Sequence, residues 1–434
     1  MKILDMAPNR GERIRQPNLR FPKWTRRDFF KNSGLLAVAG LGVDGKKSEK
    51  MTKASPASPV RSRATPPGPN IYEKIGVKPL INCQGTFTIL SGSQSLPEVK
   101  KAMDEASRHY VHLDELMEKV GLRLAELTGA EFGIVTAGCA AALTHITAAC
   151  VAGADPEKMQ RLPDLTALKN EVIMPRASRN VYDHAIRMVG VKIIEVENSQ
   201  QFRAAVNKQT AMITILGDSE DRNGVTLEEL VEVGKRQGIP VLVDAAAERP
   251  DAPNYYLKKG VDAVAYSGGK CLRGPQCSGL ALGRTDLLWA AWLNSAPHHA
   301  FGRSMKVGKE EIMGLLAAVE MWVKHRDHQA EWKQWESWLQ TITTEISKLP
   351  GVQTRVVQPG RSNVAPTLSI TWDAAKVKMT GDELKKALDE GSPRVWVPTS
   401  ARGGITIMPY MMEPGEDKIV AQRLLEAFSV AVRA

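Results

Sequence analysis

The sequence contains few cysteines and no apolar run long enough to cross a membrane. Only 5 of its 434 residues are cysteine and no two form a CxxC pair, which excludes a disulfide scaffold and argues against a zinc site. The 35 glycines and 25 prolines are too few for a collagen-like or low-complexity chain. The length therefore predicts a globular protein with one large domain and a smaller one. We interpret the five cysteines as small buried hydrophobic residues: Cys83, Cys139, Cys150, Cys271 and Cys277.

The main part of the chain also lacks a net charge, although the whole sequence carries +10. Residues 1–70 hold 15 Lys and Arg against 5 Asp and Glu and account for the entire excess, since residues 71–434 hold 43 of each sign. A basic protein often binds nucleic acid or an acidic membrane surface. Because the excess lies outside the predicted folded part, no nucleic-acid partner is expected.

Residues 1–43 have the pattern of an export signal. The pair Arg26-Arg27 lies in a basic stretch that is followed by 10 mainly apolar residues, 34–43. This stretch is shorter than the ~17–25 residues of a membrane span but suits the core of a signal peptide. The paired arginines resemble the twin-arginine signal, which implies the twin-arginine export machinery as a partner and a periplasmic location, with membrane anchoring if the signal is not cleaved. The alternative is a disordered basic tail with a chance Arg-Arg pair.

Three further regions follow this segment. Residues 44–70 are rich in Lys, Ser and Pro and have little to bury, which predicts a disordered linker. A large domain is expected over 71–325 and a small C-terminal domain over 326–434. No internal repeat is present.

The large domain alternates short apolar runs with helical patterns, such as 140–152, 182–189 and 227–237. Most of the runs are continuous, which is typical of strands buried on both faces. This order predicts an α/β fold with a mostly parallel sheet. The expected strands are 132–136, 172–175, 192–196, 211–216, 240–243, 263–266 and 279–282.

The C-terminal part has a different pattern. A long helical stretch over 308–348 is followed by a mixture of strands and helices, which predicts a smaller α+β unit. The expected strands are 352–357, 367–371, 395–398 and 405–409, and the expected helices are 381–390 and 416–432.

Lys270 follows a predicted buried strand, within Ser267-Gly268-Gly269-Lys270. Burial would disfavour the charged amine, lower the pKa of the lysine and make it a nucleophile. A Schiff base with an aldehyde cofactor would remove that cost. The glycines would let the backbone approach a planar ring, and the Ser267 hydroxyl is placed to donate to a phosphate. Taken alone, the segment also fits a tight turn with a surface lysine.

Asp244 ends another predicted buried strand, 26 residues before Lys270. An acid in this position can pair with the protonated nitrogen of a pyridine ring. The small side chain of Ala246 would let such a ring lie against the backbone. For an isolated Asp, a helix cap or a Mg²⁺ ligand are alternatives.

The segment 136–143 leads from a strand through small residues into a helix. The free N–H groups at Gly138, Cys139 and Ala140 would suit a phosphate. The segment lacks the GxGxxG spacing of a dinucleotide site, which argues against a nicotinamide-dependent enzyme. No GxxxxGK[ST] phosphate loop occurs in the chain. A phosphate-binding segment, an acid and a lysine in this order together predict pyridoxal 5′-phosphate as the cofactor.

Several segments resemble the branch of fold-type I pyridoxal-phosphate enzymes that contains selenocysteine synthase (L-seryl-tRNA selenium transferase) and D-glucosaminate-6-phosphate ammonia-lyase. The most specific is Ser267–Lys270 with Arg273-Gly274-Pro275-Gln276, and the resemblance covers about 71–325. The others are 81–88, 127–131, 180–187 and 240–246.

The resemblance implies roles for individual residues. Lys270 would bind the cofactor aldehyde and move protons, and Asp244 would face the pyridine nitrogen. Ser267 and the backbone at Gly138, Cys139 and Ala140 would hold the phosphate. The substrate would be lined by Tyr182, His184 and Arg273. In this fold type an arginine of the small domain often binds the substrate carboxylate, and Arg402 or Arg394 could do so; the alternative for each is an ordinary surface arginine.

Two further implications concern the ring and the subunits. The group that stacks on the ring should come from 176–180, where many relatives have a histidine and this chain has Ser178 and Arg179. Sites of this fold form between subunits, which implies a homodimer or a larger homo-oligomer. The segment 302–306 is a candidate to contribute across that interface.

The expected function is a pyridoxal-phosphate enzyme that removes the α-proton of a small amino acid or amino sugar acid, with β-elimination as the favoured outcome. The small-molecule amine would displace Lys270, and the freed lysine would act as the base. Transamination, racemisation and aldol cleavage stay open as alternatives. A non-catalytic binding protein on the same fold is a further alternative, against which the intact Asp244 and Lys270 argue. A tRNA-linked substrate fits poorly with a neutral main part and an exported protein.

Overall fold

The computed structural model describes residues 70–218, 224–362, 364–400 and 403–433. The predicted signal peptide and nearly all of the predicted linker lie outside these residues, as does Arg402. The predictions for these parts therefore stay predictions, and so do the predicted domain boundaries.

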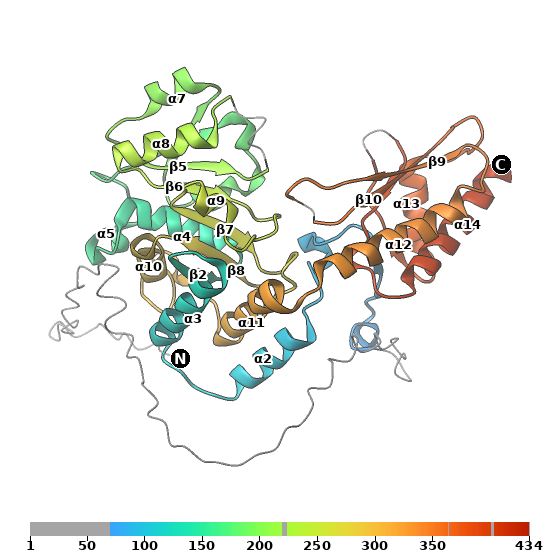
Figure 1. Ribbon diagram of the computed structural model, residues 1–434, viewed down its shortest axis with the longest axis horizontal. Coiled ribbons are helices and arrows are strands. Elements are labelled where there is room, and N and C mark those ends of the chain that lie inside the picture. Colours follow the sequence, from blue (N-terminus) through green and yellow to red (C-terminus); the bar gives the residue numbers. More distant parts are fainter. Residues whose placement is uncertain (1–69, 219–223, 363, 401–402, 434) are drawn as a thin grey trace, which may run out of the picture. The chain divides into compact units, whose positions relative to one another are not determined.

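A seven-stranded sheet forms the core of the first part of the described chain, in the order β2-β8-β7-β6-β5-β3-β4 (Figure 1). The pairs from β7 to β4 are parallel, whereas β8 runs antiparallel to both β7 and β2. The predicted α/β fold with a mostly parallel sheet is confirmed, and every predicted strand end lies within one residue of the observed one. The strands are β2 (Phe132–Thr136), β3 (Glu171–Pro175), β4 (Lys192–Val196), β5 (Thr210–Leu216), β6 (Val241–Asp244), β7 (Ala263–Ser267) and β8 (Gly279–Gly283).

Helix α4 (Cys139–Ala152) packs directly on this sheet, against β2, β5, β7 and β8. Twelve of its residues are buried, which accounts for an apolar sequence with no charged side chain. Because β2 ends only two residues before α4, the amino terminus of this helix lies at the edge of the sheet where β2 ends. The other helices of this part are α2 (Pro97–Ser107), α3 (Leu113–Thr128), α5 (Pro156–Arg161), α6 (His184–Arg187), α7 (Ser199–Ala205), α8 (Leu227–Gln237), α9 (Tyr255–Lys258), α10 (Thr285–Leu293) and α11 (Lys309–Glu320).

Two predicted helices are shorter or more broken than expected. The stretch 182–189 forms a 3₁₀ turn, η4 (Val181–Asp183), and the single-turn α6. The long stretch 308–348 passes from α11 through a π-helical turn, η7 (Met321–His325), before a new helix, α12 (His328–Ile346), begins. Asp327 causes the restart, because its carboxylate accepts hydrogen bonds from the first N–H groups of α12.

The C-terminal part has its own sheet and its own hydrophobic core. Strands β9 (Val352–Val357), β10 (Thr367–Trp372) and β12 (Ile405–Ile407) pair antiparallel in the order β12-β10-β9. With α12 they complete the α+β pattern that the sequence predicts. The remaining elements here are α13 (Gly381–Glu390) and α14 (Glu416–Arg433).

An early segment of the chain joins this second core. Strand β1 (Ile81–Asn82) pairs in parallel with β11 (Val395–Trp396), and Ile81 and Cys83 are buried among C-terminal residues. Within the described residues, no helix combines the length and the apolar character that crossing a membrane requires.

The cysteines differ in their exposure. All five are free thiols. Cys83, Cys139 and Cys271 are buried, as expected, and Cys150 is half-buried. The interpretation of Cys277 as a buried hydrophobic residue is wrong, because its side chain is exposed.

Candidate active site

Asp244 lies at the end of β6 and is buried, with 8% of its surface exposed. Its Oδ1 accepts a hydrogen bond from the Ala246 N–H at 3.1 Å, and the Cys139 Sγ lies 3.7 Å from the same oxygen. Burial raises the pKa of the Asp244 carboxyl, while these two donors and the charge of Lys270 act in the opposite direction. A cationic partner at this carboxylate would relieve the cost of its burial.

Lys270 follows β7 in a tight loop, and its side chain is half-buried rather than fully buried as the sequence predicted. Backbone hydrogen bonds from Gly268 N–H to the Ser278 oxygen and from Arg273 N–H to the Lys270 oxygen fix the loop. Ser267, three residues before Lys270, donates its N–H to the Ala246 oxygen, so the lysine loop begins beside the segment that follows Asp244.

The two glycines before Lys270 have a different role from the predicted one. A Cβ at Gly268 would lie 2.1 Å from the Ser278 Oγ, and a Cβ at Gly269 would lie 2.3 Å from the Gln276 Oε1. Side chains of this chain therefore occupy the space beside both glycines. The expectation that this space admits a planar ring is wrong.

The amino terminus of α4 faces open space. Gly138 has a φ of +100°, and a Cβ added there would meet no atom within 4 Å. Within the described residues, no side chain caps the first N–H groups of this helix. An uncapped helix start with free N–H groups, followed by 14 helical residues, is suited to bind a phosphate.

Strand register brings the predicted residues to one edge of the sheet. Gly279 of β8 pairs with Thr136 of β2 on one side and with Ser267 of β7 on the other. Ser267 also donates its N–H to the Ala246 oxygen at 3.3 Å, beside Asp244. A Cβ on Gly279 would lie 2.4 Å from the Gly138 carbonyl carbon, so only glycine allows the start of α4 to come this close.

These groups fit pyridoxal phosphate. Free N–H groups and the Ser267 hydroxyl suit its phosphate, a buried carboxylate suits its protonated ring nitrogen, and an amine suits its aldehyde. The contact between Cys139 and Asp244 places the helix start within a few ångströms of the acid, as one small molecule requires. Fold and donor set together define a fold-type I pyridoxal-phosphate enzyme.

Comparisons with known proteins agree with this class. Residues 183–411 match the family model of class-V aminotransferases, and the chain belongs to this family. It is 31% identical to the 5′-C-glycyluridine monooxygenase-decarboxylase of a Streptomyces species over 370 residues, which cover 82% of this chain and 91% of that protein. It is 29% identical to the D-glucosaminate-6-phosphate ammonia lyase of Salmonella typhimurium over 371 residues, which cover 82% of this chain and 98% of that protein.

A solved structure of a D-glucosaminate-6-phosphate ammonia-lyase matches with a TM-score of 0.74 and 28% identity, covering 84% of this chain and 99% of that one. The predicted fold, the enzyme class and pyridoxal phosphate as cofactor are therefore confirmed. The assignment of individual site residues rests on the geometry above.

Arg273 lies beside the Lys270 loop in a strained conformation. Its φ of +55° is unusual for a residue with a side chain, and such residues concentrate at functional sites. Its Nε donates to the Gln94 oxygen at 2.9 Å, and burial and the nearby Arg326 lower the pKa of its guanidinium. Within the described residues, no carboxylate forms an ion pair with it, which leaves the guanidinium available to a substrate anion.

Tyr182 and His184 lie on the surface of this chain. The Tyr182 side chain is 66% exposed, and the His184 Nδ1 contacts Arg187 at 3.1 Å. Neither side chain has a hydrogen bond to Asp244 or Lys270 in the described part of the chain. Their predicted role in lining the substrate stays a prediction.

The ring-stacking group also stays open. Ser178 is fully buried, and its Oγ accepts a hydrogen bond, 3.1 Å long, from the Leu216 N–H. The hydroxyl is therefore bonded to the last residue of β5. The guanidinium of Arg179 pairs with Asp183. Arg394, the alternative to Arg402 for the substrate carboxylate, pairs with Asp389 at 2.5 Å.

Two features of the site are not apparent from the sequence. The Cys139 thiol contacts Asp244, whereas the sequence suggested only its backbone N–H as a ligand. The Ser93 hydroxyl is buried and has no hydrogen-bond partner among the residues that the structure describes, and the Ser93 N–H donates to the Gly269 oxygen in the Lys270 loop. No motif marks Ser93, because its neighbour is 176 residues away in the sequence.

Proposed function

We propose that this enzyme is a lyase that eliminates a β-substituent and releases ammonia from a small amino acid or amino sugar acid. The observation that carries the proposal is the placement of the Asp244 carboxylate beside the open start of α4, at the sheet edge from which the Lys270 loop leaves β7. The D-glucosaminate-6-phosphate ammonia lyase supports an amino sugar acid as the substrate class. The match covers 98% of the length of that protein.

Each residue has a defined task in this reaction. The bound cofactor supplies an electron sink for the pair left when the α-proton departs. Asp244 stays ionised to hold the proton on the ring nitrogen, and the Lys270 Nζ takes the proton from the substrate α-carbon. Loss of a β-hydroxyl as water and release of the amino group as ammonia, with uptake of one water, leave a 2-oxo acid.

Arg273 is proposed to bind an anionic group of the substrate. Substitution of Arg273 by Met should raise KM about 10- to 100-fold with a smaller change in kcat, because a charge-assisted hydrogen bond is lost in ground and transition states alike. Steady-state kinetics measures this split. Unchanged KM in a protein that still binds pyridoxal phosphate would remove Arg273 from the substrate site.

The reaction is tested by incubating the purified enzyme with D- and L-amino acids and amino sugar acids. The proposal expects ammonia and a 2-oxo acid in equal amounts without a second oxo acid. Formation of a 2-oxo acid that depends on an added oxo acid would show transamination instead.

The Streptomyces relative favours a second candidate, an oxygen-dependent decarboxylation, for which O₂ uptake and CO₂ release are the measurements. We also propose a homodimer, so light scattering on the same sample should give twice the 47.5 kDa of one chain.

Exposed apolar side chains support the homodimer. Ile89 and Tyr110 are 84% and 102% exposed, and Val181 beside Tyr182 is 75% exposed. Large apolar side chains in water often mark protein interfaces. A strictly monomeric mass at micromolar concentration would refute this proposal.

Export is proposed from the sequence of the first 43 residues. Substitution of Arg26 and Arg27 by Lys should keep the protein in the cytoplasm, because lysine does not replace the arginine pair in a twin-arginine signal. Cell fractionation followed by immunoblotting measures the location. Periplasmic delivery of the Lys-Lys variant at the wild-type level would contradict twin-arginine export.

A further inference from the structure

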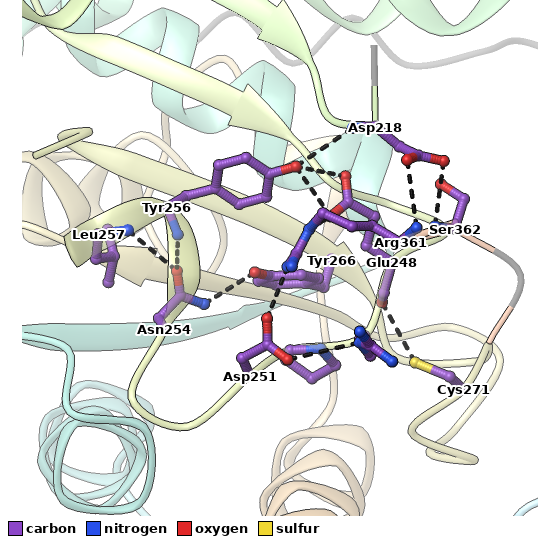
Figure 2. A network of polar contacts seen from close by, with 12 residues as sticks. Asp218, Glu248, Asp251, Asn254, Tyr256, Leu257, Tyr266, Cys271, Arg361 and Ser362 are labelled. Carbon is purple, nitrogen blue, oxygen red and sulfur yellow. Dashed lines mark hydrogen bonds and ion pairs between the residues drawn. The ribbon is translucent and has the colours of Figure 1, made fainter. Parts of the chain in front are cut away.

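Glu248 is a buried carboxylate four residues after Asp244. It is 2% exposed, and both carboxylate oxygens accept hydrogen bonds from the Tyr256 hydroxyl, at 2.7 and 2.9 Å (Figure 2). The Arg361 Nε donates to its Oε2 at 2.9 Å. Burial raises the pKa of Glu248, and the hydrogen bonds from Tyr256 and Arg361 act against that rise.

Arg361 reaches this carboxylate from the connection between β9 and β10, in the C-terminal part. Its Nη2 also donates to Asp251 Oδ2 at 2.7 Å, and its guanidinium lies 3.9 Å from the centre of the Tyr255 ring. Burial opposes the charge of Arg361, but its ion pairs with Asp251 and Glu248 prevail and raise its pKa. The Arg361 side chain thus contacts two carboxylates, those of Glu248 and Asp251, and one aromatic ring.

The backbone next to Arg361 makes a second attachment. The N–H groups of Arg361 and Ser362 both donate to the Asp218 carboxylate, at 3.3 Å each, just beyond the end of β5 (Figure 2). Asp218 in turn donates its N–H to the Tyr256 hydroxyl at 3.3 Å. The β9–β10 connection is therefore attached to the segments that follow both β5 and β6.

Glu248 also contacts the lysine loop. Its backbone oxygen accepts a hydrogen bond, 3.3 Å long, from the thiol of Cys271, the residue after Lys270. Its Oε1 also packs against the backbone of Gly217, where an added Cβ would lie 1.9 Å away. A single residue thus links the segment that carries Asp244, the loop that carries Lys270 and the C-terminal part.

Stability alone is a weak explanation for this arrangement. Taking two charges out of water costs free energy, and a buried ion pair often stabilises a fold no more than apolar residues would. A buried pair with several directed hydrogen bonds does, however, favour one arrangement of the segments that it joins.

We propose that Glu248 and Arg361 are positioning residues that hold Asp244 and Lys270 at the spacing the cofactor requires. The pair touches neither substrate nor cofactor and acts through the segment 245–251 and through Cys271. This inference rests on the proposed roles of Asp244 and Lys270. It adds that correct cofactor binding depends on a contact from the C-terminal part.

The test compares R361M, R361K and E248Q in the full-length enzyme. R361M should weaken binding of pyridoxal phosphate to the cofactor-free protein about tenfold, the lower end of the roughly 10- to 100-fold that residues which orient metal ligands contribute to metal affinity. It should also shift the pH midpoint of the visible absorption band of the bound cofactor, which reports the surroundings of the Lys270 Nζ. R361K should restore part of both properties, and E248Q should change them in the same direction as R361M by a smaller amount.

Arg284 provides a matched control, since it also joins two carboxylates, those of Asp262 and Asp286. R284M should lower the thermal stability of the cofactor-free protein and leave cofactor affinity and band titration within twofold of wild type. If R361M and E248Q behave like R284M, the pair is a structural contact only and the proposal is wrong. If R361M does not fold, E248Q and R361K decide in the same way.

The outcomes separate this inference from the proposed function. A wild-type protein that binds no pyridoxal phosphate would contradict the site itself. A wild type that binds it normally, together with R361K and E248Q variants of unchanged affinity and titration, would overturn only the positioning role.

Discussion

Substitution of Lys270 by Ala is expected to abolish the yellow absorption band and to lower the rate of the reaction by about 10²–10⁴-fold, the usual contribution of a positioned acid–base group. Both losses have one cause, since the same Nζ bonds to the cofactor aldehyde and takes the α-proton. Pyridoxal phosphate should still bind through the start of α4, Ser267 and Asp244. Absorption spectroscopy and single-turnover kinetics measure the two effects.

Lys309 offers a matched control for this substitution. It is another lysine of low exposure, with 19% of its side chain accessible, and it pairs with Glu310 on α11. K309A should keep the band and the activity. A K270A variant that retains both would contradict the assignment of Lys270.

Substitution of Asp244 by Asn should lower kcat about 10²–10³-fold while leaving the fold intact, because a neutral amide of the same shape cannot keep the ring nitrogen protonated. The free energy of unfolding of the cofactor-free protein, in contrast, should stay the same or rise. Burial raises the folded-state pKa of Asp244, so ionisation of this carboxyl costs folding free energy as the pH rises above the unfolded value. D244N removes that cost and should be at least as stable as wild type at neutral pH.

Thermal unfolding of both cofactor-free proteins and steady-state kinetics of both loaded enzymes test this prediction. A D244N variant of normal activity would show that Asp244 does not face the ring nitrogen. A strong loss of stability without cofactor would show that its carboxylate is held by groups other than Ala246 and Cys139.

Most of the sheet could be predicted from the sequence because six of its seven strands, all but β4, are almost entirely buried and are therefore continuously apolar. The same rule gave the ends of β2 without error and placed Asp244 at the end of β6 and Lys270 three residues after the end of β7. Parallel strands end at one edge of a sheet, so local patterns were sufficient to bring these two residues together.

The remaining features depend on contacts between distant residues. The break before α12 comes from a single capping residue, Asp327, within a helical pattern that otherwise continues. The glycines before Lys270 make room for Ser278 and Gln276, which only the folded loop brings near. The ion pair of Glu248 and Arg361 joins residues 113 positions apart, and neither belongs to a motif.

The central claim is that Lys270 binds pyridoxal phosphate whose phosphate lies at the start of α4. The most direct measurement is reduction of the loaded enzyme with borohydride, followed by proteolysis and mass spectrometry. The account predicts one modified peptide, with the pyridoxyl group on Lys270. An unmodified Lys270, or the group on a different lysine, would contradict it.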